Sequence, residues 1–597
     1  MYGIGGIASH KANALTAAQI CDGMLTALKS RGTGTQGTYV SEEVCLLYTG
    51  NNSPEDGKQP VRTMLGQKAY VLVYDGELYN KEAIRQELVT LGYQFQDSSD
   101  AAVVLYGYMA WGQNCVERFN GVFAFALWDN NQLFMARDRL GLRPLYYSIG
   151  AHGLVFASTI KTLLAHPQIR PAISAEGAAE ILLLGPGRSP GCGVFNGINE
   201  LEPASYAIYS GGRIETTTYW KLKARPHRED FGETTEKVKS LLVDSIKLQT
   251  SSKMRMATLL SGGLDSSAVA ALSRSRESFS VDYFGNDKHF TATAFQPEED
   301  SEYITRMVNF LGLKHRRIVL GSDELADALE DAADARGLPG MADVDASLLL
   351  FLREVGKEVQ ITLSGEGADE IFGGYPWYQD DERLFAKTFP WSQSTEYRAK
   401  FIEPSLAQKI NTPEAYVNSR FEKTMTTAET LYDDDPREAQ IRKMFMLNLH
   451  WFLQTLATRN DSMASAAGIS VRTPFLDYRL VEYLYNVPWH FKNHNDHAKG
   501  LLRESLKGLL PDSVLWRKKS PYPKTHNPAY LKWVTDMLKA TDSNAPIFSL
   551  VSKTALSNLL KEDSGVNWYG QLMAYPQTIA YFLQINSWMK KYSVIVE

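Results

Sequence analysis

The spacing of apolar and polar residues differs between the two parts of the chain. In the first third, alternating runs such as residues 68–75 (KAYVLVYD) and 122–128 (VFAFALW) predict strands, with Gly and Asn/Asp turn signals between them. Apolar positions with helical spacing occur at residues 17–29 and 80–91. We therefore expect residues 1–210 to form an α+β domain of stacked sheets covered by helices.

From residue 236 the pattern becomes an alternation of helices with short apolar runs. Four of these runs predict buried strands, at residues 257–260, 278–283, 316–319 and 359–363. Such alternation is typical of an α/β domain with a parallel sheet between helices, and beyond about residue 380 the pattern is almost wholly helical. The polar segment 211–235 predicts a linker, so we expect the second domain to span residues 236–597.

Length and charge narrow the range of functions. The 597 residues are too many for one hydrophobic core, and the net charge of −6 without a long Lys/Arg block argues against nucleic-acid or membrane-surface partners. Apolar stretches long enough to span a membrane are absent from the sequence, so we expect a cytoplasmic protein that acts on small molecules. The cysteines, which predict neither a disulfide framework nor a zinc site, are Cys21, Cys45, Cys115 and Cys192.

The strongest chemical signal is SGGLDSS at residues 261–267. It follows the apolar run ATLL and precedes a helical pattern, so backbone N–H groups of a Gly-rich turn and a helix N-terminus would point at one spot. Phosphate suits that spot, and Gly262 and Gly263 allow its close approach. Asp265 would repel phosphate unless a cation lay between them, which argues for Mg²⁺.

A second signal is SGEGADEIFGGY at residues 364–375, which also follows an apolar run. Its acidic residues Glu366, Asp369 and Glu370 stand among four glycines. A Gly-rich acidic loop at the carboxyl end of a parallel strand lies where ligands bind. We therefore interpret this segment as a functional loop and not as a solvated acidic surface.

Together the two loops resemble those of the asparagine synthetase family. Further segments agree: FNGVFAFALWD at 119–129, RNDSMASAAGISVRTPFLDYRLVEYL at 459–484, and KGLLRESLKGLLPDSVLWRKKSPYPKTHNP at 499–528. The resemblance implies a glutamine amidotransferase type 2 domain with the stacked sheets of the N-terminal-nucleophile hydrolases, then a synthetase domain of the ATP-pyrophosphatase type. The first loop lacks the lysine of GxxxxGK[ST], as in enzymes that release pyrophosphate.

The resemblance also implies a role for each matching residue. Contacts with ATP are implied for Leu260, Ser261, Gly262, Gly263, Asp265, Ser266, Val281, Ser364 and Gly365. Asp265 and Asp369 are the implied ligands of Mg²⁺. Glu366 matches the acid that takes part in forming the aspartyl-adenylate and handles the incoming amine, and Lys499 matches the lysine that stabilises charge on the α-phosphate. These implied roles are consistent with electrostatics, because the repulsion between a carboxylate and a polyphosphate must be offset by nearby cations.

Several glutamine-handling positions depart from the family pattern. Tyr2 stands where glutamine-hydrolysing members carry a nucleophilic cysteine, and a phenol cannot replace that thiol. The R-G-P-D turn reads RGTG at 31–34, and the arginine that would clamp the glutamine carboxylate is replaced around Gly50. Asp75 replaces the asparagine of N-G-E, and a carboxylate cannot donate a hydrogen bond to an oxyanion. Only Asp100 still fits, so we expect a degenerate glutaminase site.

We expect an ATP-dependent ligase that adenylates aspartate and transfers ammonia to it, releasing AMP and pyrophosphate, without glutaminase activity of its own. Ser462, Ser465 and Ser470 stand where family members often carry Arg, Met and Glu, so another carboxylate or another amine stays open as the substrate. A non-catalytic regulatory homologue is the remaining alternative. As partners we expect the small carboxylate and amine, and a homodimer as the assembly.

Overall fold

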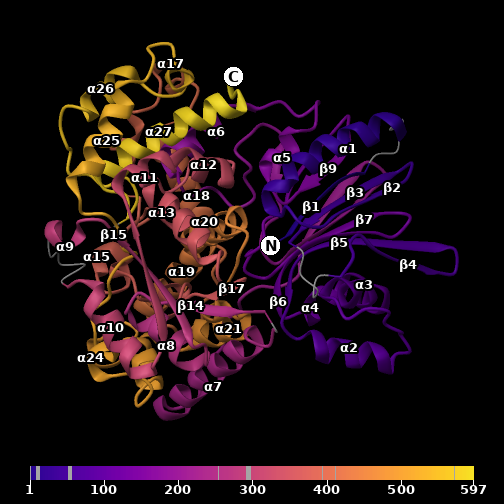
Figure 1. Ribbon diagram of the computed structural model, residues 1–597, viewed down its shortest axis with the longest axis horizontal. Helices are drawn as coiled ribbons and strands as arrows, with labels where there is room; N and C mark the ends of the chain where they lie inside the picture. Colours follow the sequence, from indigo (N-terminus) through magenta and orange to yellow (C-terminus); the bar gives the residue numbers. More distant parts are fainter. Residues whose placement is uncertain are drawn as a thin grey trace.

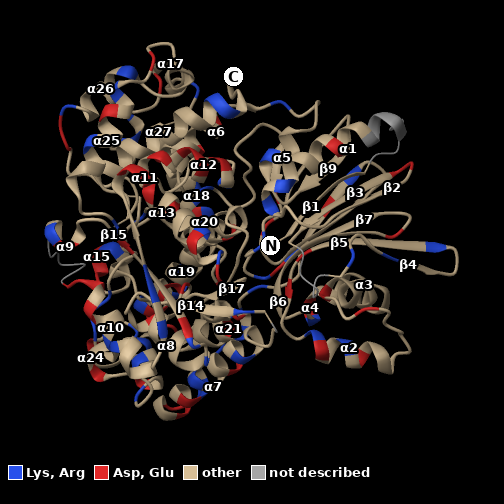
Figure 2. Cartoon of the chain, in the orientation of Figure 1, with Lys and Arg blue, Asp and Glu red and all other residues tan. Residues whose placement is uncertain are grey.

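The computed structural model describes residues 2–8, 14–51, 57–252, 254–290, 298–392, 394–410, 412–570 and 572–597. Figure 1 shows two antiparallel sheets with their helices on one side and a helix-rich remainder, built round a parallel sheet, on the other. Charged residues of both signs lie mainly on the outer helices, whereas the strands of the N-terminal sheets are largely uncharged (Figure 2). Both expected fold classes are therefore confirmed.

Two six-stranded antiparallel sheets form the N-terminal part. The first has the order β11-β8-β9-β1-β3-β2 and contains β1 (Tyr2–Ala8), β2 (Gln36–Val40), β3 (Val44–Gly50), β8 (Tyr146–Gly150), β9 (Gly153–Ala157) and β11 (Ile198–Glu200). The second has the order β13-β12-β7-β6-β5-β4 and contains β4 (Val61–Leu65), β5 (Lys68–Leu78), β6 (Gly121–Trp128), β7 (Leu133–Arg137), β12 (Ser205–Ser210) and β13 (Arg213–Thr218).

Alternating residues of the strands explain why these sheets stack. Val71 and Val73 of β5 pack with Ile4 of β1 in the core between the sheets. Leu72 and Tyr74, which point to the opposite face of β5, pack with residues of α3 (Asp100–Trp111) instead. Each sheet is therefore apolar on both faces, and α1 (Ala14–Leu28), α2 (Lys81–Thr90) and α3 cover the outer faces.

A five-stranded parallel sheet with the order β16-β15-β14-β17-β18 is the centre of the second part. Its strands are β14 (Met256–Leu259), β15 (Glu277–Tyr283), β16 (Lys314–Leu320), β17 (Ile361–Leu363) and β18 (Ser470–Arg472). The first four confirm the predicted strands. The fifth was missed, because Val471 is its only apolar residue, between Ser470 and Arg472, and it forms no apolar run.

Long helices surround this sheet and make up most of the chain beyond it. They are α7 (Phe231–Gln249), α8 (Leu264–Leu272), α10 (Asp300–Leu311), α12 (Leu329–Arg336), α13 (Asp343–Val355), α18 (Pro413–Met425), α19 (Pro436–Leu447), α20 (Leu453–Ala466), α21 (Tyr478–Asn486), α25 (Pro528–Lys539) and α27 (Tyr575–Tyr592). Residues 219–230 join β13 to α7. The exact domain limits stay a prediction. Within the described residues, none of the helices is long and apolar enough to cross a membrane.

One expectation about the cysteines was wrong. The structure contains a disulfide between Cys21 on α1 and Cys45 on β3, whereas Cys115 and Cys192 are free. The two bonded cysteines are 24 residues apart and meet only because α1 packs against the sheet, so their spacing gave no signal.

The two parts are joined by a buried ion pair at the ends of β5 and β18. Arg472 Nε donates to Glu77 Oε2 at 2.6 Å, and Ser470 Oγ donates to Glu77 Oε1 at 2.7 Å. The pair is largely buried, with side-chain exposures of 9% for Arg472 and 14% for Glu77. Burial alone would raise the pKa of Glu77, but the charges of Arg472 and Arg143 outweigh it and hold the pKa below its usual value.

We predict that Glu77→Gln lowers the free energy of unfolding at neutral pH by about 3 kcal/mol, because it leaves a buried guanidinium without its counter-charge. Urea denaturation measures this. The control Glu82→Gln removes only an exposed carboxylate 3.8 Å from Arg85 and should change little. Equal effects of the two substitutions would contradict the prediction.

The same pair predicts a pH dependence. A carboxyl whose pKa is lowered by folding stabilises the protein above its unfolded pKa, and this contribution is lost as the pH falls through the folded pKa. The difference in stability between wild type and Glu77→Gln should therefore be full at neutral pH and shrink below about pH 4.

Candidate active site

The SGGLDSS loop leaves the end of β14 and enters α8, as the sequence predicts. Gly262 has φ +69°, and a Cβ added there would lie 2.7 Å from the Cβ of Tyr303, so only glycine fits the turn. Inside the loop the hydroxyl oxygens of Ser261 and Ser266 are 2.9 Å apart. Asp265 lies in the first turn of α8. The loop thus presents N–H groups, hydroxyls and one carboxylate at a helix N-terminus, where anions are favoured.

The second loop, residues 364–375, follows β17, the neighbour of β14, and contains α14 (Ala368–Phe372). The two loops touch so closely that a Cβ on Gly365 would lie 2.6 Å from the backbone nitrogen of Ser266. Ser364 Oγ accepts a hydrogen bond from the Glu366 backbone N–H at 3.2 Å. Parallel pairing of the two strands therefore brings segments about a hundred residues apart into one site.

The centre of the site is the ammonium group of Lys499. This side chain is 3% exposed, and its Nζ lies 2.7 Å from Asp265 Oδ2 and 2.8 Å from Asp369 Oδ1. Lys519 also pairs with Asp369. Burial opposes the charge of Lys499, but Asp265 and Asp369 outweigh it and raise the lysine pKa. Burial likewise opposes the charge of Asp369, but Lys499 and Lys519 lower its pKa.

These groups line one cavity with a volume of about 260 Å³. The sequence-predicted residues on its wall are Leu260, Ser261, Gly263, Asp265, Ser266, Val281, Ser364, Gly365, Glu366, Asp369 and Lys499. Gly262 shapes the loop from behind and does not line the cavity. The expectation that residues distant in sequence share one cleft is confirmed, whereas their individual roles stay predictions.

Other lining residues were assigned no role from the sequence. Lys519 follows the matched lysine by twenty positions and lies in the same matched segment, 499–528. Arg517 also lines the cavity, where Asp300 holds it at 2.6 Å and the Tyr303 ring at 4.0 Å. Arg459 opens the matched segment 459–484 and Tyr522 lies in the matched segment 499–528, but no role was inferred for either residue. Packing brings their helix and loop to the cavity.

The carboxylates of Asp265 and Asp369 fit a magnesium site. Both approach Lys499 Nζ within 2.8 Å, so their oxygens face the same point. The described residues hold no group of three or more His, Cys, Asp or Glu side chains arranged for a metal. Mg²⁺ is typically held by one or two carboxylates together with substrate phosphates, so the two aspartates suffice only when a polyphosphate is present.

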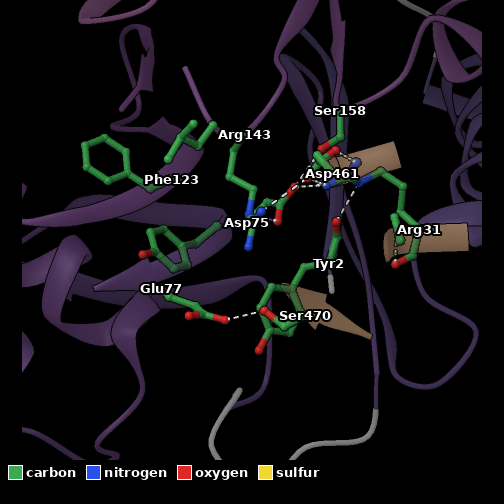
Figure 3. Close-up of polar contacts among 12 residues, drawn as sticks. Tyr2, Arg31, Asp75, Glu77, Phe123, Arg143, Ser158, Asp461 and Ser470 are labelled. Atoms are coloured by element: carbon green, nitrogen blue, oxygen red, sulfur yellow. Dashed lines mark hydrogen bonds and ion pairs between the residues drawn. The ribbon is translucent and has the colours of Figure 1, made fainter. Parts of the chain in front are cut away.

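Two of the positions expected to handle glutamine, Arg31 and Asp75, lie in a buried charge cluster with Arg143 and Asp461 (Figure 3). Arg31 Nη2 donates to Asp75 Oδ2 at 2.8 Å and to Asp461 Oδ1 at 3.1 Å. Arg143 Nη1 donates to Asp461 Oδ1 at 3.3 Å. The side chains of the cluster are at most 6% exposed. Since Asp461 lies on α20, the cluster also joins the two parts of the chain.

The chemistry of this cluster differs from that of an oxyanion site. Burial raises the pKa of Asp75, and the charges of Arg31 and Arg143 oppose the rise. Asp75 Oδ2 accepts hydrogen bonds from Arg31 at 2.8 Å and from Ser158 Oγ at 3.4 Å. Arg31 is further held by the carbonyl oxygen of Tyr2, which accepts from its Nε at 2.8 Å. The acidic residue is thus used as an acceptor and not as a donor.

Two features restrict the space next to the cluster. A Cβ on Gly50 would lie 2.3 Å from the hydroxyl oxygen of Tyr48, so a longer side chain such as arginine does not fit there. The cavity lined by Arg31 and Ser158 has a volume of about 20 Å³, enough for about one water. Residues 52–56 of the expected clamp segment lie outside the described residues. Asp100 accepts from the Leu78 backbone N–H at 2.6 Å and pairs with Lys81.

Comparison with known proteins agrees over both parts. Residues 237–590 match the family model described as asparagine synthase, and residues 1–220 match the glutamine amidotransferase domain. Asparagine synthetase [glutamine-hydrolyzing] 3 of Bacillus subtilis (strain 168) is 40% identical and covers 100% of both chains. Asparagine synthetase [glutamine-hydrolyzing] 1 of the same organism is 27% identical and covers 83% of this chain and 82% of that protein.

The close contact of the two loops gives a prediction. Gly365→Ala should force the SGGLDSS loop away from its neighbour and weaken ATP binding at least about tenfold, since misplaced N–H donors lose their contacts with the phosphates. Isothermal titration with ATP measures this. The matched control is Gly23→Ala, where the added Cβ meets only the Ala165 carbonyl oxygen at 4.0 Å. Unchanged ATP affinity in Gly365→Ala would rule out this loop contact as part of the nucleotide site.

Proposed function

This chain belongs to the asparagine synthetase family of ATP-dependent carbon–nitrogen ligases, and we propose that it forms asparagine from aspartate and free ammonia without hydrolysing glutamine. In the first step a carboxylate oxygen of aspartate attacks the α-phosphorus of ATP, and pyrophosphate leaves. In the second, ammonia attacks the carbonyl carbon of the aspartyl-adenylate, loses a proton, and AMP leaves.

One observation carries the proposal. A buried lysine, Lys499, lies between Asp265 of the first loop and Asp369 of the second, directly beside the Gly-rich turn. We assign the ATP phosphates to the N–H groups of that turn and assign Lys499 to the charge that builds up on the α-phosphate. Mg²⁺ held by Asp265 and Asp369 would offset the repulsion between polyphosphate and carboxylate.

Glu366 is suited to receive the proton of the attacking ammonia. It lines the same cavity, and burial raises the pKa of its carboxyl, while the charge of Arg459 opposes that rise. A carboxylate with a raised pKa is a better proton acceptor than an exposed one. Glu366 belongs to the second loop, so the pairing of β14 with β17 also positions its carboxyl group next to the first loop.

The aromatic side chains that line the cavity favour a second candidate function. Tyr375, Trp377 and Phe452 pack with ring centroids 4.5–5.5 Å apart and line the cavity together with Tyr522. Aspartate is small and polar, whereas this wall could contact an apolar body. The second candidate is therefore amide formation on a larger carboxylate by the same two steps. A homodimeric assembly stays a prediction.

The proposed loss of glutaminase activity sets this chain apart from its Bacillus subtilis relative, whose name describes it as glutamine-hydrolysing. The support is chemical. Tyr2 offers no thiol, and Asp75 is a hydrogen-bond acceptor held by two arginines. The domain would then serve as a scaffold whose charge cluster holds the synthetase part in place.

The experiment that tests the proposed function measures pyrophosphate release. Purified protein is incubated with ATP, Mg²⁺ and a panel of carboxylates, with ammonium or glutamine as the nitrogen source. Release with aspartate and ammonium, together with asparagine as the product, would support the first candidate. Release only with a larger carboxylate would support the second, and absence of release with every carboxylate would contradict both.

We predict that Lys499→Ala cuts turnover by about 10²-fold or more, the usual scale for losing one transition-state charge contact, while ATP still binds. Steady-state kinetics and ATP titration measure the two effects. Lys507→Ala is the control, because that lysine pairs with Glu504 and its side chain is 57% exposed. Full activity of Lys499→Ala would remove this lysine from the mechanism.

We also predict that glutamate is not released from glutamine above the background rate, and that Tyr2→Cys alone does not restore release. The thiol would still lack a donor for the oxyanion, since Asp75 would remain a hydrogen-bond acceptor. A coupled glutamate assay on both proteins measures this. Glutamate formation by the wild type at a rate comparable to amide synthesis would show that the domain is an active glutaminase.

A further inference from the structure

Arg503 is a buried cation of the cavity that the two proposed steps do not use. It lies on the short helix α23 (Gly500–Ser505), is 3% exposed and lines the cavity. Burial lowers the pKa of its guanidinium, and the charges of Asp265 and Asp369 oppose this fall without cancelling it. Among the described residues, no carboxylate forms an ion pair with it. Its hydrogen bonds must therefore explain why it is buried here.

Backbone carbonyl groups from two segments of the chain hold the Arg503 guanidinium. Its Nε donates to the Ala498 carbonyl oxygen at 2.9 Å, and its Nη2 donates to the Arg517 carbonyl oxygen at 3.0 Å. Its Nη1 donates to the Leu515 carbonyl oxygen. Three of the five N–H donors of a guanidinium are thus used. The planar fork joins the turn before α23 to residues 515–517.

The turn that Arg503 holds carries Lys499. This lysine precedes α23 and has φ +59° and ψ +33°, in the left-handed region. That conformation is unfavourable for a residue with a Cβ, so it persists only where neighbouring contacts impose it. Arg503 supplies two such contacts, because its side chain binds the Ala498 carbonyl and its backbone N–H donates to the Lys499 carbonyl oxygen at 3.0 Å.

The backbone of Lys499 matters most when the nucleotide is bound. In the structure its ammonium is held by Asp265 and Asp369. In the proposed adenylation the ammonium turns toward the α-phosphate, so these two contacts no longer fix its direction. The lysine stem is then aimed by its own backbone, and a displacement of about 1 Å can cost about 10²-fold in rate.

Arg517, at the other end of the cross-link, has anchors of its own. Its Nη2 donates to Asp300 Oδ1 at 2.6 Å, and its guanidinium lies 4.0 Å from the centroid of the Tyr303 ring. Removal of the Arg503 side chain should therefore displace Lys499 more than Arg517.

We propose that Arg503 is a positioning residue, which holds the backbone of Lys499 in the conformation that aims its ammonium at the α-phosphate. This inference rests on the proposed function and adds to it a residue that touches no substrate. The rival role is direct contact of the two remaining N–H donors with a phosphate. The two roles differ in one respect, because a positioning residue acts through Lys499 and a phosphate ligand acts independently of it.

A double-mutant cycle separates the two roles. Pyrophosphate release with aspartate and ammonium, and ATP affinity by titration, are measured for wild type, Arg503→Met, Lys499→Ala and the double variant. Arg503→Lys is added because it keeps the charge, but its N–H groups lie on one atom and cannot reach three separate carbonyls. The control Arg353→Met removes an arginine of α13 whose partner is the exposed Asp331. Urea denaturation shows whether each variant is folded.

We expect Arg503→Met and Arg503→Lys each to lower kcat about 10- to 100-fold and to leave the Kd for ATP within about threefold. In the Lys499→Ala background, Arg503→Met should lower kcat by only about threefold or less, because the lysine that it positions is already absent. Arg353→Met should behave as wild type. If Arg503→Met does not fold, Arg503→Lys takes its place in the cycle.

Three results would overturn the assignment. If Arg503→Lys is as active as wild type, the charge matters and the cross-link does not. If Arg503→Met lowers kcat equally with and without Lys499, the arginine acts independently of the lysine. If ATP affinity falls about tenfold or more in Arg503→Met, the arginine is a phosphate ligand. In each case wild-type activity leaves the proposed function standing, whereas absence of pyrophosphate release from the wild type with every carboxylate would overturn both.

Discussion

The ammonium of Lys499 holds together the part of the structure on which the chemistry depends. It contacts Asp265 at the start of α8, Asp369 at the start of α14, and itself precedes the short helix Gly500–Ser505. Three segments separated by more than a hundred residues thus share one buried charge. Without the lysine, Lys519 would still pair with Asp369, but Asp265 would lose its counter-charge in a poorly solvated cavity, which favours uptake of a proton. The lysine ammonium and the two aspartate carboxylates are therefore already in place for a polyphosphate and its cation before any nucleotide binds.

A second set of buried charges lies at the boundary between the two parts of the chain. Arg31, Asp75 and Arg143 belong to the part that resembles an amidotransferase, and Asp461 comes from the synthetase part (Figure 3). Together with the pair of Glu77 and Arg472, they form a buried polar interface in which charges of opposite sign balance. Such an interface costs desolvation, and it is tolerated because each charge has a partner. The buried pairs therefore hold the amidotransferase-like part against the synthetase part.

Much of the fold was open to prediction from local patterns. Alternation in 68–75 and 122–128 gave β5 and β6, and the short apolar runs gave four of the five parallel strands. β18 was not predicted because Val471, between Ser470 and Arg472, is its only apolar residue, whereas the equally short β17 lies in an apolar run. The pairing of Cys21 with Cys45 was not predicted. These two residues meet because the apolar side chains of Met24 and Leu28 pack α1 against the sheet that contains β3. The spacing of apolar residues predicts whether one segment is a helix or a strand. It does not predict which helices and strands pack against each other.

The sequence by itself determined which residues to expect at the candidate site. Turn chemistry and strand patterns, which are local properties, located the two glycine-rich loops, and the family resemblance supplied the expected roles of Glu366, Asp369 and Lys499. Only the tertiary structure decided what those residues share and what else joins them. It placed Lys499 between two aspartates, brought Lys519 to the same carboxylate, and left Arg459 buried without a hydrogen-bond partner for its Nε among the described residues. These contacts depend on the distances between side chains that are far apart in the chain. Their charges are buried, and therefore energetically important, only when α20 packs against the sheet.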